Sequence, residues 1–580
     1  MWNLNFKIPE QKSQVSSNRD LRPKIIGRWL EDLPRANIGV MAKQVYTLLV
    51  ESNSLKLPPS ERLKLLQQLY NPVDYILEAM EKHYVGLSLP FPEKNQKIAL
   101  LAQSLLQEII VAHKSIIIDS FYNEKPSKNR LQLATVMQNH MAFNNRLLLC
   151  LHLTYSTIPK EFWREQGLIL QYAEQLSITD LAVFGNSSPW SVINRFKQAI
   201  LLTISTPCSL GQQEILRFNH YLTEWSPHCR LLSMKKYTPG LHTLFIDLHG
   251  DEGPQYIENL EWYSHSWRII DTGELIPAIE GEITKPRDNL ASIQLHRETL
   301  QRLQKQLGSE QKRQFNRIEK RDTFTLAIGI SAIHWMLSHH IGINNYDVVR
   351  PACYMNAFIT NVGHSDAPDV WNLYRKAEMS NTLGGKVADK PIEYETYDFD
   401  VINESANGFK LKLKQKQQQT ASGLKVGELI SLHKGFNGTG KHFGLALIRW
   451  LHRTINNEFL IGVELIAPQA LPVEVSLYSE NENSSLQHKM RALLLPELPA
   501  IKQPTALIMP NTFKENQQVL LQNGDEQEDQ LIILKQQKNQ GSSYAQYQYD
   551  HIEKKIKHTP KTPFNTQRND GSLDNTWELL

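Results

Sequence analysis

The sequence predicts a multidomain α+β protein, with a helical first half and a β-rich second half. The chain has 580 residues, which is long enough for several domains. Apolar residues recur at helical spacing across residues 26–235. From residue 243 onward, short apolar runs alternate with turn-forming residues, a pattern typical of strands. Because the two patterns occupy different parts of the chain, we expect helices and strands in separate domains.

Composition argues against several classes of function. The net charge is +3, which is too small for the protein as a whole to attract nucleic acid or a membrane surface. The four cysteines form no CxxC pair, which argues against a zinc ribbon or a disulfide framework and fits a reducing compartment. We find no signal peptide and no run of about eighteen or more apolar residues. We therefore expect a cytoplasmic protein with no membrane span, no metal, no cofactor and no nucleic-acid partner.

The first half is predicted to be a stack of antiparallel helices. Residues 1–25 are polar and contain two prolines, so we expect an extended arm there. The helical domain follows at residues 26–235. One of its helix faces is formed by Ile38, Met41, Val45, Leu48 and Leu49. Trp163 and Gly167 echo a tetratricopeptide helix, but no regular period is present, so an irregular helical domain is the preferred interpretation.

A small mixed α/β junction is predicted at residues 236–297. Its candidate strands are residues 243–248, 267–270 and 274–277. A polar helix follows at residues 298–316, with leucines at helical spacing. This helix leads directly into the first of two motifs.

The first motif is an RxxxR pair formed by Arg317 and Arg321. Arg313 extends the same spacing backwards. The pair runs into an apolar, strand-like segment at residues 324–337. Guanidinium groups fork onto phosphate oxygens or onto guanine O6 and N7, and they also stack on purine rings. An RxxxR pair on an irregular segment could therefore grip an anionic, purine-containing ligand.

The second motif is NxSxxG, formed by Asn403, Ser405 and Gly408 at another strand end. Asn403 and Ser405 alternate along a strand, so both side chains should point to one face and offer hydrogen bonds there. Gly408 lets the backbone turn sharply or approach a ligand closely.

The two motifs together, followed by two further strand-like segments, resemble the signature of PilZ domains. These domains are small antiparallel β-barrels that bind the bacterial second messenger cyclic di-GMP. The first later segment, residues 443–450, ends in Arg-Trp, and the second, residues 459–465, carries Gly-Val, in the order of PilZ strands. The resemblance covers roughly residues 310–480. It implies that cyclic di-GMP is bound by Arg317, Arg321, Asn403, Ser405 and Gly408, with Arg313 as an addition.

The resemblance also implies a barrel interrupted by a large insertion. Arg321 and Asn403 lie farther apart in the sequence than the two motifs of most PilZ domains. We therefore expect a PilZ-like antiparallel β-barrel over residues 298–480, with an insertion at about 340–395. Additional β-structure is expected at residues 481–552, and a disordered tail at 553–580.

Other chemical constellations carry less weight. The Gly-rich segment 435–442 nearly spells a phosphate-binding P-loop, but its last position is His442 rather than Ser or Thr, and a strand follows it instead of a helix. Asp247, His249 and Asp251 lie close together with no evident nucleophile, so a polar turn is the preferred interpretation.

Two further sets of polar residues also have ordinary structural interpretations. His334, His339 and His340 lie at the end of the first barrel strand without acidic or cysteine partners at metal-ligand spacing. The alternating lysines of residues 410–418 are typical of an exposed edge strand.

The resulting hypothesis is a non-enzymatic cyclic di-GMP receptor. Ligand binding would order the segment that carries the arginines, and the signal would pass through the helical half to a protein partner. Two alternatives stay open. In one, the barrel has lost nucleotide binding and the protein is a constitutive helical scaffold. In the other, it is an enzyme that acts through the Gly-rich segment or the Asp247–Asp251 turn.

Overall fold

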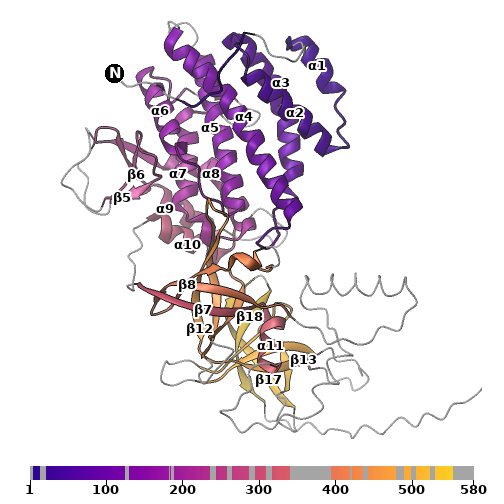
Figure 1. Ribbon diagram of the computed structural model, residues 1–580. Coiled ribbons are helices and arrows are strands. Elements are labelled where there is room, and N and C mark those ends of the chain that lie inside the picture. Colours follow the sequence, from indigo (N-terminus) through magenta and orange to yellow (C-terminus); the bar gives the residue numbers. More distant parts are fainter. Residues whose placement is uncertain are drawn as a thin grey trace, which may run out of the picture. The chain divides into compact units, whose positions relative to one another are not determined.

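The computed structural model is shown in Figure 1. The residues that it describes are 4, 6–13, 21–123, 130–181, 183–184, 189–234, 243–257, 264–285, 294–308, 317–339, 394–418, 421–434, 442–478, 489–497, 504–522, 529–541 and 543–552. The chain divides into two compact units, residues 1–333 with 394–469 and residues 334–393 with 470–580. The predicted fold class is confirmed: helices fill the first half, and closed β-barrels follow.

The helical domain is a stack of long helices that cover one another's apolar faces. Its helices are α1 (Pro23–Glu31), α2 (Ile38–Asn53), α3 (Pro59–Glu81), α4 (Glu93–Asn123), α5 (Arg130–Leu153), α6 (Phe162–Gln175), α7 (Val192–Ile204) and α8 (Gln212–Trp225). Helices α2, α3, α4 and α5 run side by side (Figure 1). The Asn37 side chain accepts a hydrogen bond from the Val40 N–H and so starts α2. Val45, Leu48 and Leu49 of the predicted face are fully buried.

Helix α4 is long and apolar enough to cross a membrane by composition alone. However, 61% of its most apolar window is buried inside the domain. It packs against α2, α3 and α5, which is the position of a core helix.

The described part of residues 1–25 packs on the helical domain instead of extending away from it. Leu4 and Phe6 are buried in the same core as the helices, and Lys12 pairs with Leu55 in a parallel β-bridge. Helix α1 already begins at Pro23, where proline at a helix start loses no hydrogen bond. The apolar residues Leu4 and Phe6 account for this difference from the predicted arm.

A four-stranded antiparallel sheet lies beside α6. Its strands are β3 (Arg230–Ser233), β4 (Leu244–Asp247), β5 (Gln255–Tyr256) and β6 (Trp267–Asp271), in the order β3-β6-β4-β5. The strand predicted at residues 274–277 is wrong, because α9 (Leu275–Thr284) begins there. Leu275 and Ile279 are spaced for one helix face and are fully buried, and Pro277 falls in the first turn, which tolerates proline. Helix α10 (Arg297–Gly308) follows.

Trp163 and Gly167 serve the packing of α6 on this sheet. A side chain at residue 167 would overlap the backbone of Leu248, and one at residue 253 would touch the Trp163 ring. The two residues that echo a tetratricopeptide helix are therefore explained by a close approach of α6 to the loop after β4.

The first barrel is closed and antiparallel. Its strands are β7 (Ile318–Ile328), β8 (Tyr397–Ser405), β9 (Gly408–Leu413), β10 (Leu429–Lys434), β11 (His442–Arg453) and β12 (Phe459–Ala467), in the cyclic order β10-β11-β12-β9-β8-β7. Strands β7 and β8 pair directly, so the long gap between the two motifs falls between neighbouring strands. The predicted insertion at 340–395 lies almost entirely outside the described residues.

Two local predictions in this barrel are wrong. The strand predicted through residue 337 ends at Ile328, because Gly329 has a φ of 84° and α11 (Ile330–His339) follows. His334 and His339 therefore lie on a helix, and His340 lies outside the described residues. The lysine-rich strand β9 is also no edge, because β8 and β12 flank it.

The first barrel and the helical domain share one compact unit and one continuous hydrophobic core. Leu89 and Leu424 form an antiparallel bridge with hydrogen bonds of 2.9 and 3.1 Å. At the end of β11, the Arg453 N–H donates to the Tyr155 carbonyl oxygen at 2.7 Å, and the Thr157 hydroxyl donates to the Arg453 carbonyl oxygen at 3.0 Å. Main-chain contacts thus join the barrel to the loop between α5 and α6.

The additional β-structure forms a second closed barrel. Its strands are β13 (Leu471–Leu477), β14 (Met490–Leu495), β15 (Ala506–Pro510), β16 (Gln518–Gln522), β17 (Gln530–Gln540) and β18 (Tyr544–His551). Val473, Met509, Val519 and Ile532 lie in its core. Strand β13 already begins at Leu471, so the first barrel ends before the predicted boundary at residue 480. Residues 553–580 lie outside the described part of the chain.

Candidate ligand-binding site

A pocket of about 150 Å³ lies on the outer surface of the first barrel, where β8, β9, β11 and β12 are neighbours. It is lined by Arg317, Asn403, Ser405, Asn407, Gly408, Phe409, Lys410, Arg449, Trp450, Gly462, Val463 and Glu464. Four of the six residues predicted from the motifs are among them.

Strand register brings the polar residues of the pocket together. Asn403 pairs with Lys410, Lys410 pairs with Gly462, and Gly462 pairs with Trp450. Directly paired residues of antiparallel strands project to the same face of the sheet. This row of residues therefore crosses four neighbouring strands on one face, although its members are far apart in the sequence.

Irregularities in register accompany the pocket on two strands. The pairing shifts between Val401 and Asn403 on β8 and between Ile448 and Trp450 on β11. Val401 and Ile448 are buried in the core, so regular alternation would also send the residues two positions later inward. An extra residue in each strand instead directs Asn403 and Trp450 to the outer face, as β-bulges commonly do beside functional sites.

Two glycines of the pocket lie where a side chain would clash with a neighbouring strand. A side chain at residue 408 would overlap the Val463 carbonyl oxygen, and one at residue 462 would overlap the Trp450 indole. Gly408 is therefore required by the close approach of β12. The Ser405 hydroxyl donates to the Gly408 carbonyl oxygen at 3.2 Å and so closes the β8–β9 hairpin. Both motif residues thus have a local structural role.

The pocket is mainly cationic. Arg317, Lys410 and Arg449 contribute positive charge, and the carboxylate of Glu464 forms an ion pair with Arg449. Arg317 is exposed, and within the described part of the chain its side chain forms no hydrogen bond or ion pair. An exposed guanidinium with no partner among these residues is available for an anion.

The other predicted arginines lie elsewhere. Arg321 is exposed in β7, within a further irregularity in register between Glu319 and Asp322, and does not line the pocket. Arg313 lies outside the described residues.

Lys410, Arg449, Trp450 and Glu464 were not predicted as site residues. A signal for three of them was present, because Arg449-Trp450 and the Gly-Val pair before Glu464 marked the later strands of the resemblance. Lys410 belongs to the lysine run that was interpreted as an edge. Their proximity to Asn403 depends on pairing between distant strands, which local patterns do not report.

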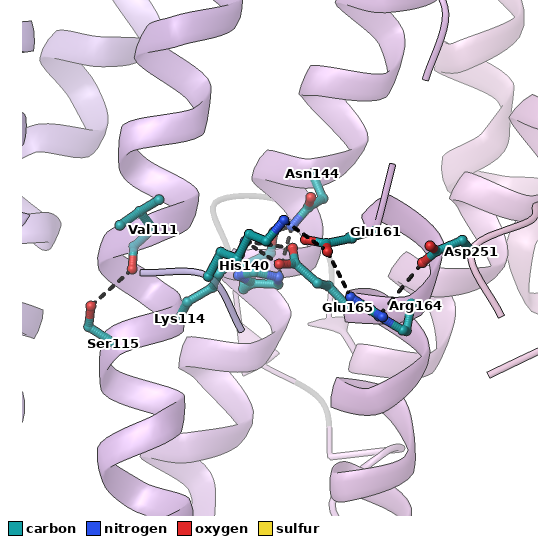
Figure 2. A network of polar contacts seen from close by, with 10 residues as sticks. Val111, Lys114, Ser115, His140, Asn144, Glu161, Arg164, Glu165 and Asp251 are labelled. Atoms are coloured by element: carbon teal, nitrogen blue, oxygen red, sulfur yellow. Dashed lines mark hydrogen bonds and ion pairs between the residues drawn. The ribbon is translucent and has the colours of Figure 1, made fainter. Parts of the chain in front are cut away.

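The Asp247–Asp251 turn is held by structural contacts. Asp247 accepts hydrogen bonds from the His249 N–H at 2.9 Å and the Ser266 hydroxyl at 2.6 Å, and His249 bonds Gln171 of α6 at 2.9 Å. Figure 2 shows that Asp251 reaches Arg164 of α6, at 3.6 Å. The turn therefore anchors the sheet to α6. Among the described residues, no cluster of His, Cys, Asp and Glu could hold a metal. The Gly-rich segment 435–441 lies outside them.

Figure 2 also shows a buried ion pair in the helical domain. Lys114 of α4 contacts Glu165 of α6 at 2.5 Å, and both side chains are almost fully covered. Burial raises the pKa of Glu165, while the Lys114 charge opposes that rise. The pair ties α4 to α6, and it lies in the helical domain rather than at the pocket.

Three family models match consecutive parts of the chain. Residues 24–236 match the N-terminal domain of the cyclic-di-GMP receptor FimW, residues 243–381 and 374–472 match its middle PilZ domain, and residues 475–552 match the FimW C-terminal β-barrel domain. The cyclic-di-GMP receptor FimW of Pseudomonas aeruginosa is 28% identical over 582 residues, which is 94% of this chain and 93% of that protein. No solved structure matches.

Proposed function

We propose that the chain, which matches the models of the three FimW domains in order, is a non-enzymatic receptor for cyclic di-GMP. The observation that carries this proposal is the pocket on the first barrel, which collects Arg317, Asn403, Ser405 and Gly408 from the two motifs. We assign the protein to the cytoplasm on the composition of its sequence.

The positive charge of the pocket suits the two phosphodiesters of the ligand. Arg317 and Lys410 would bind phosphate oxygens through charge-assisted hydrogen bonds. The resemblance assigns Arg321 and Arg313 to the same set of contacts, although Arg321 does not line the pocket and Arg313 lies outside the described residues. These contacts form only with the ligand present, so binding would favour the state in which the arginines lie on the ligand.

The guanine bases would use the other side chains. The half-buried indole of Trp450 offers a flat surface for stacking, which is worth roughly 1–3 kcal/mol per base. Asn403 and Ser405 would offer hydrogen bonds to a base edge. The pocket volume of about 150 Å³ is below the roughly 300–1,000 Å³ of pockets that enclose drug-sized ligands. The described residues would therefore contact one part of the dinucleotide and leave the rest outside.

Isothermal titration of the purified full chain with cyclic di-GMP tests this proposal. We expect saturable binding at micromolar concentration or tighter, and no heat with GTP at the same concentration. Absence of heat together with an unchanged melting temperature would overturn the assignment.

We also propose that the helical half receives the signal and holds a protein partner. Strand β11 supports this route, because it carries Arg449 and Trp450 in the pocket and ends at Arg453, which bonds the loop between α5 and α6. His452 lies between them and contacts the Thr157 hydroxyl at 3.3 Å. Residues 450–453 of one strand therefore connect the proposed ligand site to the helical domain.

The alternative is a scaffold whose barrel no longer binds the dinucleotide. It is favoured by the local roles of Ser405 and Gly408, which explain both residues without a ligand. The same titration separates the two functions, because the scaffold predicts neither heat nor thermal stabilisation.

A further inference from the structure

The ion pair between Arg449 and Glu464 has a feature that phosphate binding does not explain. Glu464 places a carboxylate in a pocket whose other charged residues, Arg317, Lys410 and Arg449, are all cations. A carboxylate repels the phosphodiesters of a dianionic ligand, so its presence there calls for a hydrogen-bond donor on the same ligand. We propose that the Arg449–Glu464 pair reads the guanine edge and selects guanine over adenine. This inference rests on the proposed function.

The position of the pair leaves it open to a base. Arg449 is the extra residue of the β11 irregularity, and Glu464 lies on the neighbouring strand β12, directly opposite Gly408. Gly408 has no side chain, so one flank of the carboxylate is uncovered. The side chains of Arg449 and Glu464 are 48% and 43% exposed. Within the described residues, neither side chain forms another hydrogen bond or ion pair.

The pairing chemistry matches guanine. The Watson–Crick edge of guanine presents the O6 acceptor, then the N1–H donor, then the N2–H₂ donors. The ion pair presents guanidinium N–H donors next to two carboxylate oxygens. Arg449 bonds Glu464 through its Nε, so its terminal N–H groups are left for O6. Glu464 accepts from N1–H and N2–H₂. Together the two side chains imitate the donor–acceptor–acceptor pattern of cytosine.

Adenine has the opposite pattern at both positions. Its N6–H₂ donor would face the guanidinium, and its N1 acceptor would face the carboxylate. Two unmet hydrogen bonds beside charged groups disfavour that base strongly. The nearby Trp450 ring stacks on either purine, so stacking alone cannot make this distinction.

The test compares cyclic di-GMP with cyclic di-AMP on the wild-type chain and on Glu464→Gln. Glutamine keeps the size of the side chain, removes its charge, and can pair with adenine through one donor and one acceptor. We expect the preference for cyclic di-GMP over cyclic di-AMP to fall at least about tenfold, through weaker guanine binding, stronger adenine binding, or both. Glu458→Gln is the matched control, because Glu458 pairs with Lys412 on the same barrel at 2.6 Å and does not line the pocket. It should leave the preference unchanged.

Arg449→Lys gives a second measurement. Lysine keeps the positive charge beside Glu464 but cannot fork onto the carboxylate and O6 together, so the preference should fall here as well. An equal loss of affinity for both dinucleotides, as expected if the carboxylate binds a ribose hydroxyl, would overturn the inference. So would an unchanged preference in Glu464→Gln. If the wild-type chain binds neither dinucleotide, the proposed function itself fails. If the wild-type chain binds cyclic di-GMP and Glu464→Gln keeps the same preference, only this inference fails.

Discussion

The indole of Trp450 lies directly on the backbone of Gly462, across the pairing of β11 with β12, and leaves no room for a methyl group on residue 462. This contact places a flat aromatic side chain on the outer surface of the barrel, beside Lys410. The pocket therefore depends on a glycine that belongs to neither of the two motifs.

Gly462→Ala should displace Trp450 and damage the pocket. The added methyl group would force the ring to move, and overpacking of this kind costs typically about 1–3 kcal/mol. We expect a lower free energy of unfolding in urea and weaker binding of cyclic di-GMP. Gly281→Ala is the control, because nothing lies within 4 Å of a side chain at that helical position. It should be neutral or stabilise by about 0.5–1 kcal/mol. Equal behaviour of the two variants would contradict the proposed contact.

Replacing both Arg317 and Arg321 by alanine should abolish binding of cyclic di-GMP. Both side chains are exposed, so the melting temperature should stay within about 1–2 °C of wild type, as surface substitutions usually change stability little. Titration calorimetry measures the first effect and differential scanning fluorimetry the second. Arg297→Ala, at the exposed start of α10, controls for a general loss of positive charge. Wild-type affinity in the double variant would move the site away from the RxxxR motif.

The contact between Thr157 and Arg453 should carry the effect of the ligand to the helical domain. Thr157→Val keeps the shape of the side chain and removes the hydroxyl that donates to the Arg453 carbonyl oxygen. In wild type, we expect cyclic di-GMP to slow amide hydrogen exchange in residues 154–158, and in the variant we expect most of that protection to be lost while binding is retained. Thr135→Val on α5 removes an exposed hydroxyl that also donates to a carbonyl oxygen, far from this contact. It should change neither the protection of residues 154–158 nor the affinity for the ligand. Full protection in Thr157→Val would exclude this route.

Stability should fall on the acid side of neutrality because of His113. Burial lowers its pKa to about 4, and it lies fully covered between the Tyr70 hydroxyl and the Ile109 carbonyl oxygen, each at 2.8 Å. The unfolded chain takes up a proton near pH 6.5, whereas the folded chain resists protonation until about pH 4. The contribution of His113 to the free energy of unfolding is therefore complete above pH 6.5 and is lost progressively as the pH falls toward 4.

The expected loss from His113 is on the order of a few kcal/mol, measured as the free energy of unfolding in urea at pH 7 and pH 5. His433 has a pKa lowered to about 4 by burial and should add to the slope. His113→Gln should flatten the dependence on pH, since it removes one of the groups that titrate. If the free energy of unfolding of that variant changes with pH as steeply as in wild type, other residues determine the dependence.

Much of the fold and of the site was readable from local patterns. The 3.6-residue period identified the helical domain, and four of the five residues of its predicted face, including Val45 and Leu48, are buried. Alternation placed Asn403 and Ser405 on one face, and both line the pocket. Local patterns failed where a short apolar run fits either structure. The segment after Ile328 was predicted as strand, but Gly329 ends the strand and a helix follows.

The sequence by itself determined the chemistry of the site, and the tertiary structure decided its membership and shape. RxxxR and NxSxxG are local spacings, so their arginines, amide and hydroxyl could be named before any fold was known. Lys410, Trp450 and Glu464 join Asn403 only because β9, β12 and β11 pair in one register as the barrel closes. Irregularities in register then turn Asn403 and Trp450 outward against the regular alternation. Register is set by packing across the whole barrel, and a pattern confined to one strand does not contain that information.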